Sequence, residues 1–445
     1  MRRRGARRMT VLGAAITALG MTATLAGCGG PGGSGDVTLK LVAADYGDSA
    51  ANSSKKYWDE LAGAYEDKHP GVKVDVSVYS WNDVDSKVKQ MVDRGDAPDL
   101  AQIGAYADYA AAGKLYRVSD LLSIPVQADF VPELSRAGEV DRVQYGMPFA
   151  ASTRLLFYNK KLFAKAGISR PPETWNQLAA DAHALRTAGV STPYALPLGP
   201  EEAQAETLQW LLSGGGDYTD SIGDYDLDSV ENVATFSWLK DELVGKGLTG
   251  PVPPAKLNRA DAFAAFARGE VGMLNGHPTL MKTARAKGLD FGMVPMPVNG
   301  SGSGSGSGNG SGNGDEGADG RDRPSMGVAD WMMAFRQPGH REQVGDFLDF
   351  VYSKKNVLAF SREYDLLPAT TSASADMASS PKDADLAPFL EQLAGAELYP
   401  VGKTSWATVS AELKKQIGTA VSEEGSPAGV LGQLQRTAMR EDATG

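Results

Sequence analysis

Residues 145–175 read YGMPFAASTRLLFYNKKLFAKAGISRPPETW, and this stretch guides the interpretation of the rest of the chain. It ends on a helix start, because the Thr174 hydroxyl can cap free backbone N–H groups while Gln177 reaches back toward the cap. Gly189 can end the helix. Between these signals apolar side chains recur at helical spacing: Trp175, Leu178, Ala182 and Leu185. The pattern predicts a helix with one buried face.

A strand–helix–strand unit precedes this stretch. Val37–Val42 and Val72–Val78 alternate apolar and polar residues, which is typical of strands. From Ser53 to His69, apolar residues recur at helical spacing: Tyr57, Leu61, Ala64 and Tyr65. Such a unit is the building block of a largely parallel sheet covered by helices. The sequence therefore predicts an α/β fold.

Length and composition exclude several classes of protein. The 445 residues, 42% of them hydrophobic, suffice for two or three domains or for one fold with two large lobes. One cysteine excludes disulfides and a cysteine zinc site, and four histidines leave little material for a histidine cluster, so we expect neither metal nor cofactor. The net charge of −11 argues against a nucleic-acid partner, which requires clustered Lys and Arg.

The amino terminus has the pattern of an export signal. Residues 2–8 carry five arginines, and the mainly apolar or small residues Val11–Ala26 lead to Cys28. A transmembrane helix is the alternative, but it would need about 20 strongly apolar residues. The sequence Leu-Ala-Gly-Cys at 25–28 resembles a bacterial lipobox, which implies that residues 1–27 are a removed signal peptide and that Cys28 is acylated. Arg7-Arg8 leaves twin-arginine export open as a second route.

Removal of the signal peptide would change both the charge and the location of the protein. The mature chain would carry a net charge of about −16, so charge alone would not hold it on an anionic bilayer. A lipid on Cys28 would hold it there. We therefore expect an exported protein that is anchored to the outer face of the cytoplasmic membrane.

Two segments have a composition that favours flexibility. Residues 28–36 are rich in glycine and are interpreted as a flexible tether. Residues 300–314 contain only Gly, Ser and Asn. The segment that follows, Arg323–Phe335, is too apolar and too short to begin a new domain. We therefore expect a long, disordered surface loop at 300–314 inside a lobe, and not a linker between domains.

Two more motifs accompany the opening stretch. APDL at 97–100 is followed by AGKL at 112–115, and FARGEVGM at 266–273 leads into Asn275-Gly276. With these motifs in this order and spacing, the chain from about Val37 to Ala438 resembles the large family of extracellular solute-binding proteins that serve sugar importers, the group containing maltose-binding protein. The chain departs from that pattern where His277-Pro278 replaces a common aromatic residue, and at the Gly/Ser/Asn run. Both departures concern the ligand more than the fold.

The resemblance implies a two-lobed, periplasmic-binding-protein-like (type II) α/β fold, in which a hinge lets the lobes close around a ligand in the cleft. The chain would cross the hinge near Phe149–Thr153, return near Asn275 and cross again near Trp331–Phe335. The predicted N-terminal lobe therefore comprises residues 37–150 plus about 276–330, and the predicted C-terminal lobe comprises residues 151–275 plus about 331–445.

A sugar site needs aromatic platforms for ring faces and fixed polar groups for hydroxyls. The resemblance implies that Trp331, preceded by Asp330, and Trp406, in a segment where maltose-binding protein has a sugar-stacking tryptophan, face the cleft. Core positions are the alternative for both tryptophans. Trp81 follows a strand end, where α/β ligand sites are built, although it could instead pack on the next helix.

The remaining candidates are mostly polar. Arg154 could donate a bidentate pair of hydrogen bonds to a ligand, or form a simple ion pair. His277 could equally be a satisfied loop residue. The other candidate ligand-binding residues are Asp45, Tyr46, Tyr106, Gln204 and Tyr364. Among the other tryptophans, Trp210 fits either the core or the cleft wall, and those on helical stripes are expected in the core: Trp58, Trp175 and Trp238.

We therefore expect a monomeric binding protein without enzymatic activity that delivers a carbohydrate, preferably a di- or oligosaccharide, to the permease subunits of an ABC importer. One alternative is a secreted glycoside hydrolase, which needs two carboxylates about 5–9.5 Å apart. No sequence signature marks such a pair. Another alternative is a sugar-sensing lipoprotein of the same fold, which the sequence does not separate from a transport protein.

Overall fold

The computed structural model describes residues 36–47, 52–81, 83–300 and 325–443. The predicted signal peptide, Cys28, all but the last residue of the tether and nearly all of the 300–314 run lie outside these residues. Among the helices that the structure describes, none is long and apolar enough to cross a bilayer.

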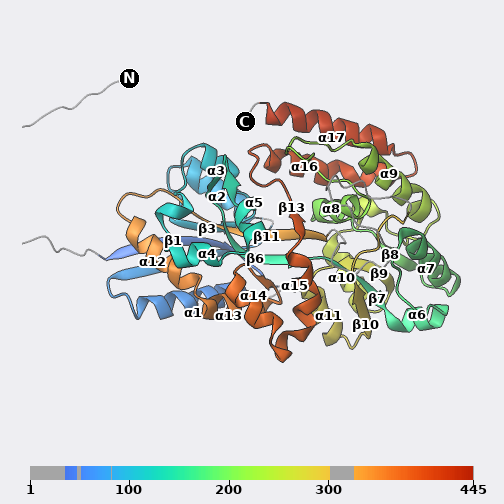
Figure 1. The fold of residues 1–445 in the computed structure, drawn as a ribbon, viewed down its shortest axis with the longest axis horizontal. Coiled ribbons are helices and arrows are strands. Elements are labelled where there is room, and N and C mark those ends of the chain that lie inside the picture. The colour runs from blue at the N-terminus through green and yellow to red at the C-terminus, as the bar shows by residue number, and fades with distance from the viewer. Residues whose placement is uncertain (1–35, 48–51, 82, 301–324, 444–445) are drawn as a thin grey trace, which may run out of the picture. The chain divides into compact units, whose positions relative to one another are not determined.

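A seven-stranded sheet organises one part of the fold (Figure 1). Its three N-terminal strands run parallel, with β1 (Val37–Ala44) between β2 (Val72–Tyr79) and β3 (Leu100–Ile103). Strand β11 (Ser325–Ala334) lies antiparallel between β3 and β6 (Met147–Thr153). A further strand, β13 (Ala396–Leu398), pairs with β11. The other strands, in spatial order, are β12 (Leu367–Pro368), β6 (Met147–Thr153), β11 (Ser325–Ala334), β3 (Leu100–Ile103), β1 (Val37–Ala44) and β2 (Val72–Tyr79).

A four-stranded sheet organises the other part. Its order is β10 (Phe291–Val294), β7 (Leu155–Asn159), β9 (Val271–Gly276) and β8 (Thr192–Ala195). A separate hairpin joins β4 (Glu139–Val140) and β5 (Val143–Gln144). Two α/β parts built on separate sheets make up the two-lobed fold, as predicted.

Helices cover both sheets. Those that pack with the large sheet or its neighbours are α1 (Ser54–Glu66), α2 (Val84–Asp93), α3 (Ala107–Ala111), α4 (Ile124–Asp129), α5 (Pro132–Ala137), α12 (Arg341–Val351), α13 (Lys354–Tyr364), α14 (Thr371–Ala378) and α15 (Ala387–Leu393). Those that pack with the small sheet or with one another are α6 (Lys160–Ala166), α7 (Trp175–Thr187), α9 (Val230–Trp238), α10 (Arg259–Ala267), α11 (Thr279–Ala286), α16 (Trp406–Gln416) and α17 (Pro427–Asp442). Helix α8 (Ala203–Ser213) contacts β11 of the large sheet as well as α9 and α16.

The local predictions are confirmed at the elements that carried them. β1, α1 and β2 form the predicted parallel strand–helix–strand unit. At α7 the Thr174 hydroxyl accepts the N–H of Gln177, and the Gln177 side chain accepts the N–H of Thr174, which completes the capping box. Gly189, with φ at +83°, follows the end of this helix, where a left-handed conformation favours glycine.

The strand pairing differs from the predicted lobe boundaries after Asn275. β10 pairs with β7, so Phe291–Val294 belong to the small sheet and not with residues 37–150. Conversely, β11 pairs along its length in the large sheet, so Trp331–Ala334 do not cross into the second lobe. The reason is that β11 forms hydrogen bonds with neighbours on both sides, which keeps the whole strand in one sheet. The first passage between sheets is close to its prediction, because β6 ends at Thr153 and β7 begins at Leu155.

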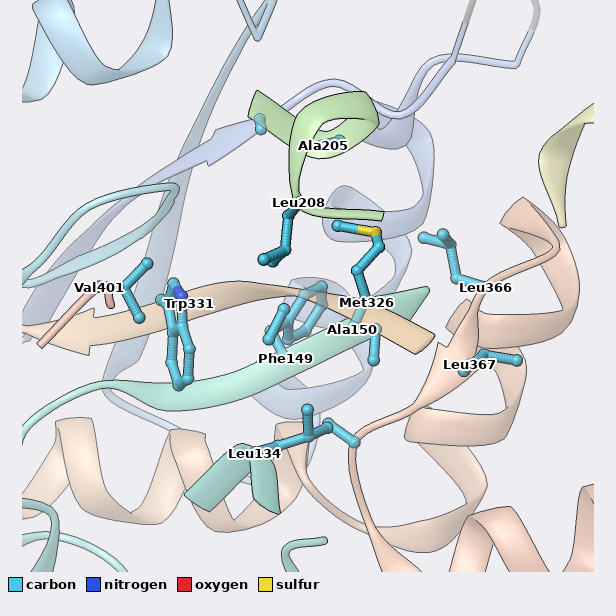
Figure 2. Packing of buried hydrophobic residues seen from close by; sticks show 14 of the residues in the cluster. Leu134, Phe149, Ala150, Ala205, Leu208, Met326, Trp331, Leu366, Leu367 and Val401 are labelled. Atoms are coloured by element: carbon cyan, nitrogen blue, oxygen red, sulfur yellow. The ribbon is translucent and has the colours of Figure 1, made fainter. Parts of the chain in front are cut away.

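Apolar side chains connect the two sheets. Figure 2 shows Leu208 of α8, Trp331 of β11 and Val401 of the loop before α16 close to one another. All three side chains are buried. The Gln209 side-chain carbonyl also accepts the N–H of Met326, at 3.3 Å. Helix α8 is therefore joined to β11 by both apolar and polar contacts.

Candidate functional site

An aromatic cluster forms at the carboxyl ends of β1 and β2. The ring of Tyr46, just after β1, contacts Trp81 edge-to-face at 5.4 Å between centroids, and contacts Phe360 in the same way at 5.0 Å. Tyr364 lies 5.7 Å from Tyr46. Trp81 keeps 37% of its surface exposed. The structure thus brings together three predicted site residues, Tyr46, Trp81 and Tyr364, and adds Phe360, which sequence reasoning missed.

Asp330 lies against this cluster. The Tyr46 hydroxyl donates to Asp330 Oδ2 at 2.7 Å and accepts from the Gln102 side-chain amide at 2.8 Å. Burial raises the pKa of Tyr46 well above its usual value, so the phenol keeps the proton that it donates. The pairing of β11 with β6 shifts register between Asp330 and Trp331, which is the local irregularity expected beside a functional residue.

The electrostatics of Asp330 are unusual for an aspartate. Burial raises its pKa to about 7, and the charges of Glu202 and Asp85 act in the same direction. The hydrogen bond from Tyr46 opposes them. Glu202 precedes α8, so a residue associated with the small sheet acts on a residue of the large sheet.

Asp45, next to Tyr46, has a local role instead. Its carboxylate accepts the hydroxyl of Ser53 at 2.7 Å and the N–H groups of Ser54 and Gly47 at 2.8 and 3.0 Å. Burial raises its pKa, but these bonds outweigh burial and lower it overall. These bonds fix the start of α1, which is the role that the structure shows for Asp45.

A second aromatic group lies on the side of α8 and α16. Trp406 stacks on Tyr399 at 5.5 Å between centroids with 24° between the planes, and contacts Tyr218 at 5.3 Å. The Tyr399 hydroxyl is buried without a hydrogen-bond partner among the described residues. Burial raises its pKa, as do the charges of Glu202 and Asp330, while Arg154 lowers it. Tyr399 therefore shares the electrostatic environment of Asp330, and no motif in the sequence marked it.

Charged residues form a network of ion pairs beside the start of α8. Arg154, 4% exposed, pairs with Glu202, and Arg259 pairs with Glu201 and Glu202. Burial raises the pKa of Glu202, but the two arginines outweigh burial and lower it. Of the two predicted roles of Arg154, the structure shows the ion pair.

His277 lies near these arginines. Burial lowers its pKa well below the usual value, and the charges of Arg154 and Arg259 lower it further, so the ring is neutral near pH 7. Its Nδ1 lies 2.9 Å from the hydroxyl of Thr279, and its ring contacts Phe263.

Glu206 is a buried carboxyl group that the sequence did not mark. Its Oε1 accepts from Trp210 Nε1 at 2.8 Å, Asn275 Nδ2 at 3.2 Å and the Tyr194 hydroxyl at 3.3 Å. Burial raises its pKa to about 7. Two residues earlier, the predicted site residue Gln204 has a side-chain carbonyl that is buried without a partner among the described residues.

Four predicted aromatic site residues lie in the buried core: Trp331, Tyr106, Trp406 at 6% exposure and Tyr364 at 8%. Trp331 has no exposed surface and packs at 5.3 Å from Tyr106, which is 1% exposed. The Tyr106 hydroxyl donates to the carbonyl of Ala137. Gly146 of the opening stretch lies against both rings, and a Cβ there would come within 2.8 Å of Tyr106 and 2.9 Å of Trp331. Trp331 therefore occupies a core position in this structure, because an aromatic ring enclosed on all sides has no face for a ligand.

The other tryptophans follow their predicted placement with one exception. Trp58 and Trp175 are buried, and Trp210 resolves to the core. Trp238 is only partly buried, although it packs on Trp175 at 4.8 Å. Among the residues that the structure describes, no group of three or more His, Cys, Asp and Glu side chains could hold a metal ion.

Known proteins resemble this chain along most of its length. A protein of Brucella abortus named as a binding protein is 26% identical over 399 residues, which is 88% of this chain and 90% of that protein. The diacetylchitobiose binding protein DasA of Streptomyces coelicolor is 29% identical over 220 residues, which is 47% of this chain and 50% of that protein.

Solved structures resemble the fold. The cyclic α-maltosyl-1,6-maltose binding protein of Arthrobacter globiformis superposes with a TM-score of 0.74 at 19% identity, covering 92% of this chain and all of that one. The family described as bacterial extracellular solute-binding protein matches residues 50–358, more than half of the chain. The resemblance in the sequence motifs is thereby confirmed, and the chain belongs to the bacterial extracellular solute-binding protein family.

Proposed function

We propose that the protein is the substrate-binding component of an ABC importer and that it binds a carbohydrate between its two lobes. The observation that carries this proposal is a pair of aromatic groups, one around Tyr46 that includes Asp330 and one around Trp406 that includes Tyr399, with an electrostatic interaction between Asp330 and Tyr399. Aromatic rings provide apolar surface for the faces of a sugar, and the carboxylate and hydroxyl provide partners for its edge.

The names of the relatives support a carbohydrate. Diacetylchitobiose and a cyclic maltosyl-maltose are both oligosaccharides, and the proteins that bind them resemble this chain in sequence or in fold. Tyr46 and Trp81 lie in one aromatic group and Tyr399 and Trp406 in another, and two such groups would suit a ligand with more than one sugar ring. We therefore infer a di- or oligosaccharide.

The proposal includes export, anchoring and partners. The export signal and Cys28 would place the acidic mature chain outside the cell on a lipid anchor, where it would deliver its ligand as a monomer to the permease. Cys28→Ser should release the protein into the medium or leave its precursor unprocessed. Mass spectrometry of the mature N-terminal peptide checks this, and an acylated peptide in the variant would contradict the anchor.

Glycoside hydrolysis is the second candidate, because Asp330, with a pKa of about 7, and the ionised Glu202 act on each other. A retaining hydrolase needs a free carboxylate as the nucleophile. Both oxygens of Glu202 face arginines, since Arg154 donates a hydrogen bond to Oε1 and Arg259 forms an ion pair with Oε2. This pairing favours binding over hydrolysis, and a sensing role would use the same bound state.

Calorimetric titration with a panel of mono- and oligosaccharides tests the proposal. We expect saturable binding and no product after prolonged incubation. Trp406→Ala should weaken binding by about 1–3 kcal/mol if its ring supports the ligand, while Trp58→Phe, in the core, serves as the control. Sugar cleavage in proportion to protein concentration would replace the binding proposal with the hydrolase.

A further inference from the structure

Unlike Glu201 and Glu202, Asp330 has no ion pair among the described residues. Glu202 pairs with Arg154 and Arg259, and Glu201 pairs with Arg259. Asp85 accepts the N–H of Gly104 at 3.2 Å and is influenced by the charge of Lys414. Among the residues that the structure describes, Asp330 has no ion pair, and its side chain bonds only the Tyr46 hydroxyl.

The neighbouring charges increase the cost of ionising Asp330. Glu202, from the segment before α8, and Asp85, from α2, both repel a negative charge on it. Asp330 is partly buried, and a carboxylate withdrawn from water without a counter-ion is unfavourable. A neutral ligand would not supply the counter-ion. A positively charged ligand group would supply the missing counter-ion.

The surroundings of Asp330 also suit a cation for a second, independent reason. The Tyr46 ring that holds the carboxylate contacts Trp81, Phe360 and Tyr364. Aromatic faces attract an ammonium group through the ring quadrupole, and aromatic clusters of this kind recognise amines. The partly exposed ring of Trp81 leaves surface for such a contact.

A third group, Tyr399, directly follows β13 of the large sheet. The Tyr399 hydroxyl is buried without a hydrogen-bond partner among the described residues, and it lies within the electrostatic influence of Asp330. A phenol oxygen can accept a hydrogen bond from an ammonium N–H. Carboxylate, rings and hydroxyl together provide a charge partner, apolar faces and a further acceptor.

We propose, resting on the proposed carbohydrate function, that the ligand contains an amino sugar whose protonated amine lies against Asp330 and the rings of Tyr46 and Trp81. The charge of the amine makes Asp330 an ionised partner, and the sugar rings extend from it toward Tyr399 and Trp406. The site thus selects an unacetylated amino sugar over a neutral sugar of the same skeleton.

Matched sugars test this selection. Cellobiose, diacetylchitobiose and unacetylated chitobiose differ mainly at C2, and glucose with glucosamine provides the monosaccharide pair. Calorimetry near pH 7 should show the amino sugar binding at least about tenfold more tightly than its neutral counterpart. Asp330→Asn, which retains the shape of a neutral acid, should abolish this preference by weakening the amino sugar more than the neutral sugar. Asp96→Asn removes an equal charge at an exposed position, and should retain the preference.

Each alternative outcome is informative. Equal affinity for charged and neutral sugars, or an equal loss for both in Asp330→Asn, would overturn the inference, since Asp330 would then bind hydroxyl groups. If Asp330→Asn does not fold by circular dichroism, the preference of the unaltered protein decides. If no sugar binds, the proposed carbohydrate function fails. Spermidine, a cation without a sugar, then tests the amine site by itself: binding that Asp330→Asn abolishes would support it, and no binding would overturn it.

Discussion

Replacement of Arg154 by methionine would test how charge is balanced where the chain passes from β6 to β7. The Arg154 side chain is 5% exposed and that of Glu202 is 22% exposed, so the pair is largely removed from water. Loss of one partner of a buried pair costs about 3–5 kcal/mol, because the other charge remains buried. Glu202 would keep Arg259 as a partner and part of its exposure. We therefore expect Arg154→Met to lower the free energy of unfolding by about 2–3 kcal/mol near pH 7.

The ionisation of Glu202 determines how the destabilisation by Arg154→Met changes with pH. In the unaltered protein its pKa is lowered, so its contribution to stability is present above the unfolded pKa and is lost as the pH falls through the folded pKa. Without Arg154, burial would dominate and raise that pKa. The contribution would then be most favourable in acid and would decline as the pH rises. The destabilisation by Arg154→Met should therefore be larger at pH 8 than at pH 5.

Urea unfolding at pH 5, 7 and 8, with sugar absent, measures the effect. Arg268→Met is the matched control, because Arg268 bonds Glu270 twice at 2.8 Å but both side chains are 52% exposed. The control should cost less than about 1 kcal/mol, as exposed ion pairs do. A double variant, Arg154→Met with Glu202→Met, should recover part of the loss, since it leaves no unpaired charge. A destabilisation that equals the control, or that does not change with pH, would refute this account of the pair.

Three further variants test other parts of the structure by the same unfolding measurement. Glu206→Gln should make the protein more stable at pH 8 by as much as about 3 kcal/mol. Because the pKa of Glu206 is about 7, its contribution to stability is lost as the pH rises from about 4.5 through 7, whereas a Gln Oε1 can keep the three hydrogen bonds. Equal stability of the two proteins across this pH range would contradict the raised pKa. Gly146→Ala should cost about 1–3 kcal/mol, because its Cβ would collide with Tyr106 and Trp331; an unchanged midpoint would show that these rings move aside. Thr174→Ala should cost about 1 kcal/mol through loss of the capping box, whereas Thr174→Ser should cost less than half of this, and equal losses would mean that the cap is not responsible.

Local patterns predicted those elements whose signals are contained in the chain itself. The period-two strands at Val37 and Val72, and the capping box at Thr174, required no information about distant residues, and the structure shows both. The order of strands in a sheet has no such local signal. β11 is flanked by β3 and β6, which are far from it in sequence, so the lobe boundaries after Asn275 were misplaced.

The candidate site was predicted only in part for a related reason. Tyr46 and Trp81 follow strand ends, where ligand sites of α/β proteins form, and this positional rule brought them together with Tyr364. The predicted cleft position of Trp331 is not seen in the structure, because two residues adjacent on a strand point to opposite faces. Asp330 faces Tyr46, while Trp331 faces Tyr106. Tyr399, Glu202 and Arg259 lie in segments without a motif, so only the folded chain shows that they share one electrostatic environment.

The contacts of α8 connect the core to the candidate site. Leu208 packs near Trp331, and Gln209 accepts the N–H of Met326, so the middle of this helix is held on β11 (Figure 2). Glu202, directly before the helix, forms ion pairs with Arg154 and Arg259. Its charge also raises the pKa of Asp330. A buried contact with interlocked side chains resists displacement more strongly than polar groups that exchange partners with water or a ligand. The contacts of α8 with β11 therefore hold Glu202, directly before the helix, on the same packed unit as Asp330 of β11.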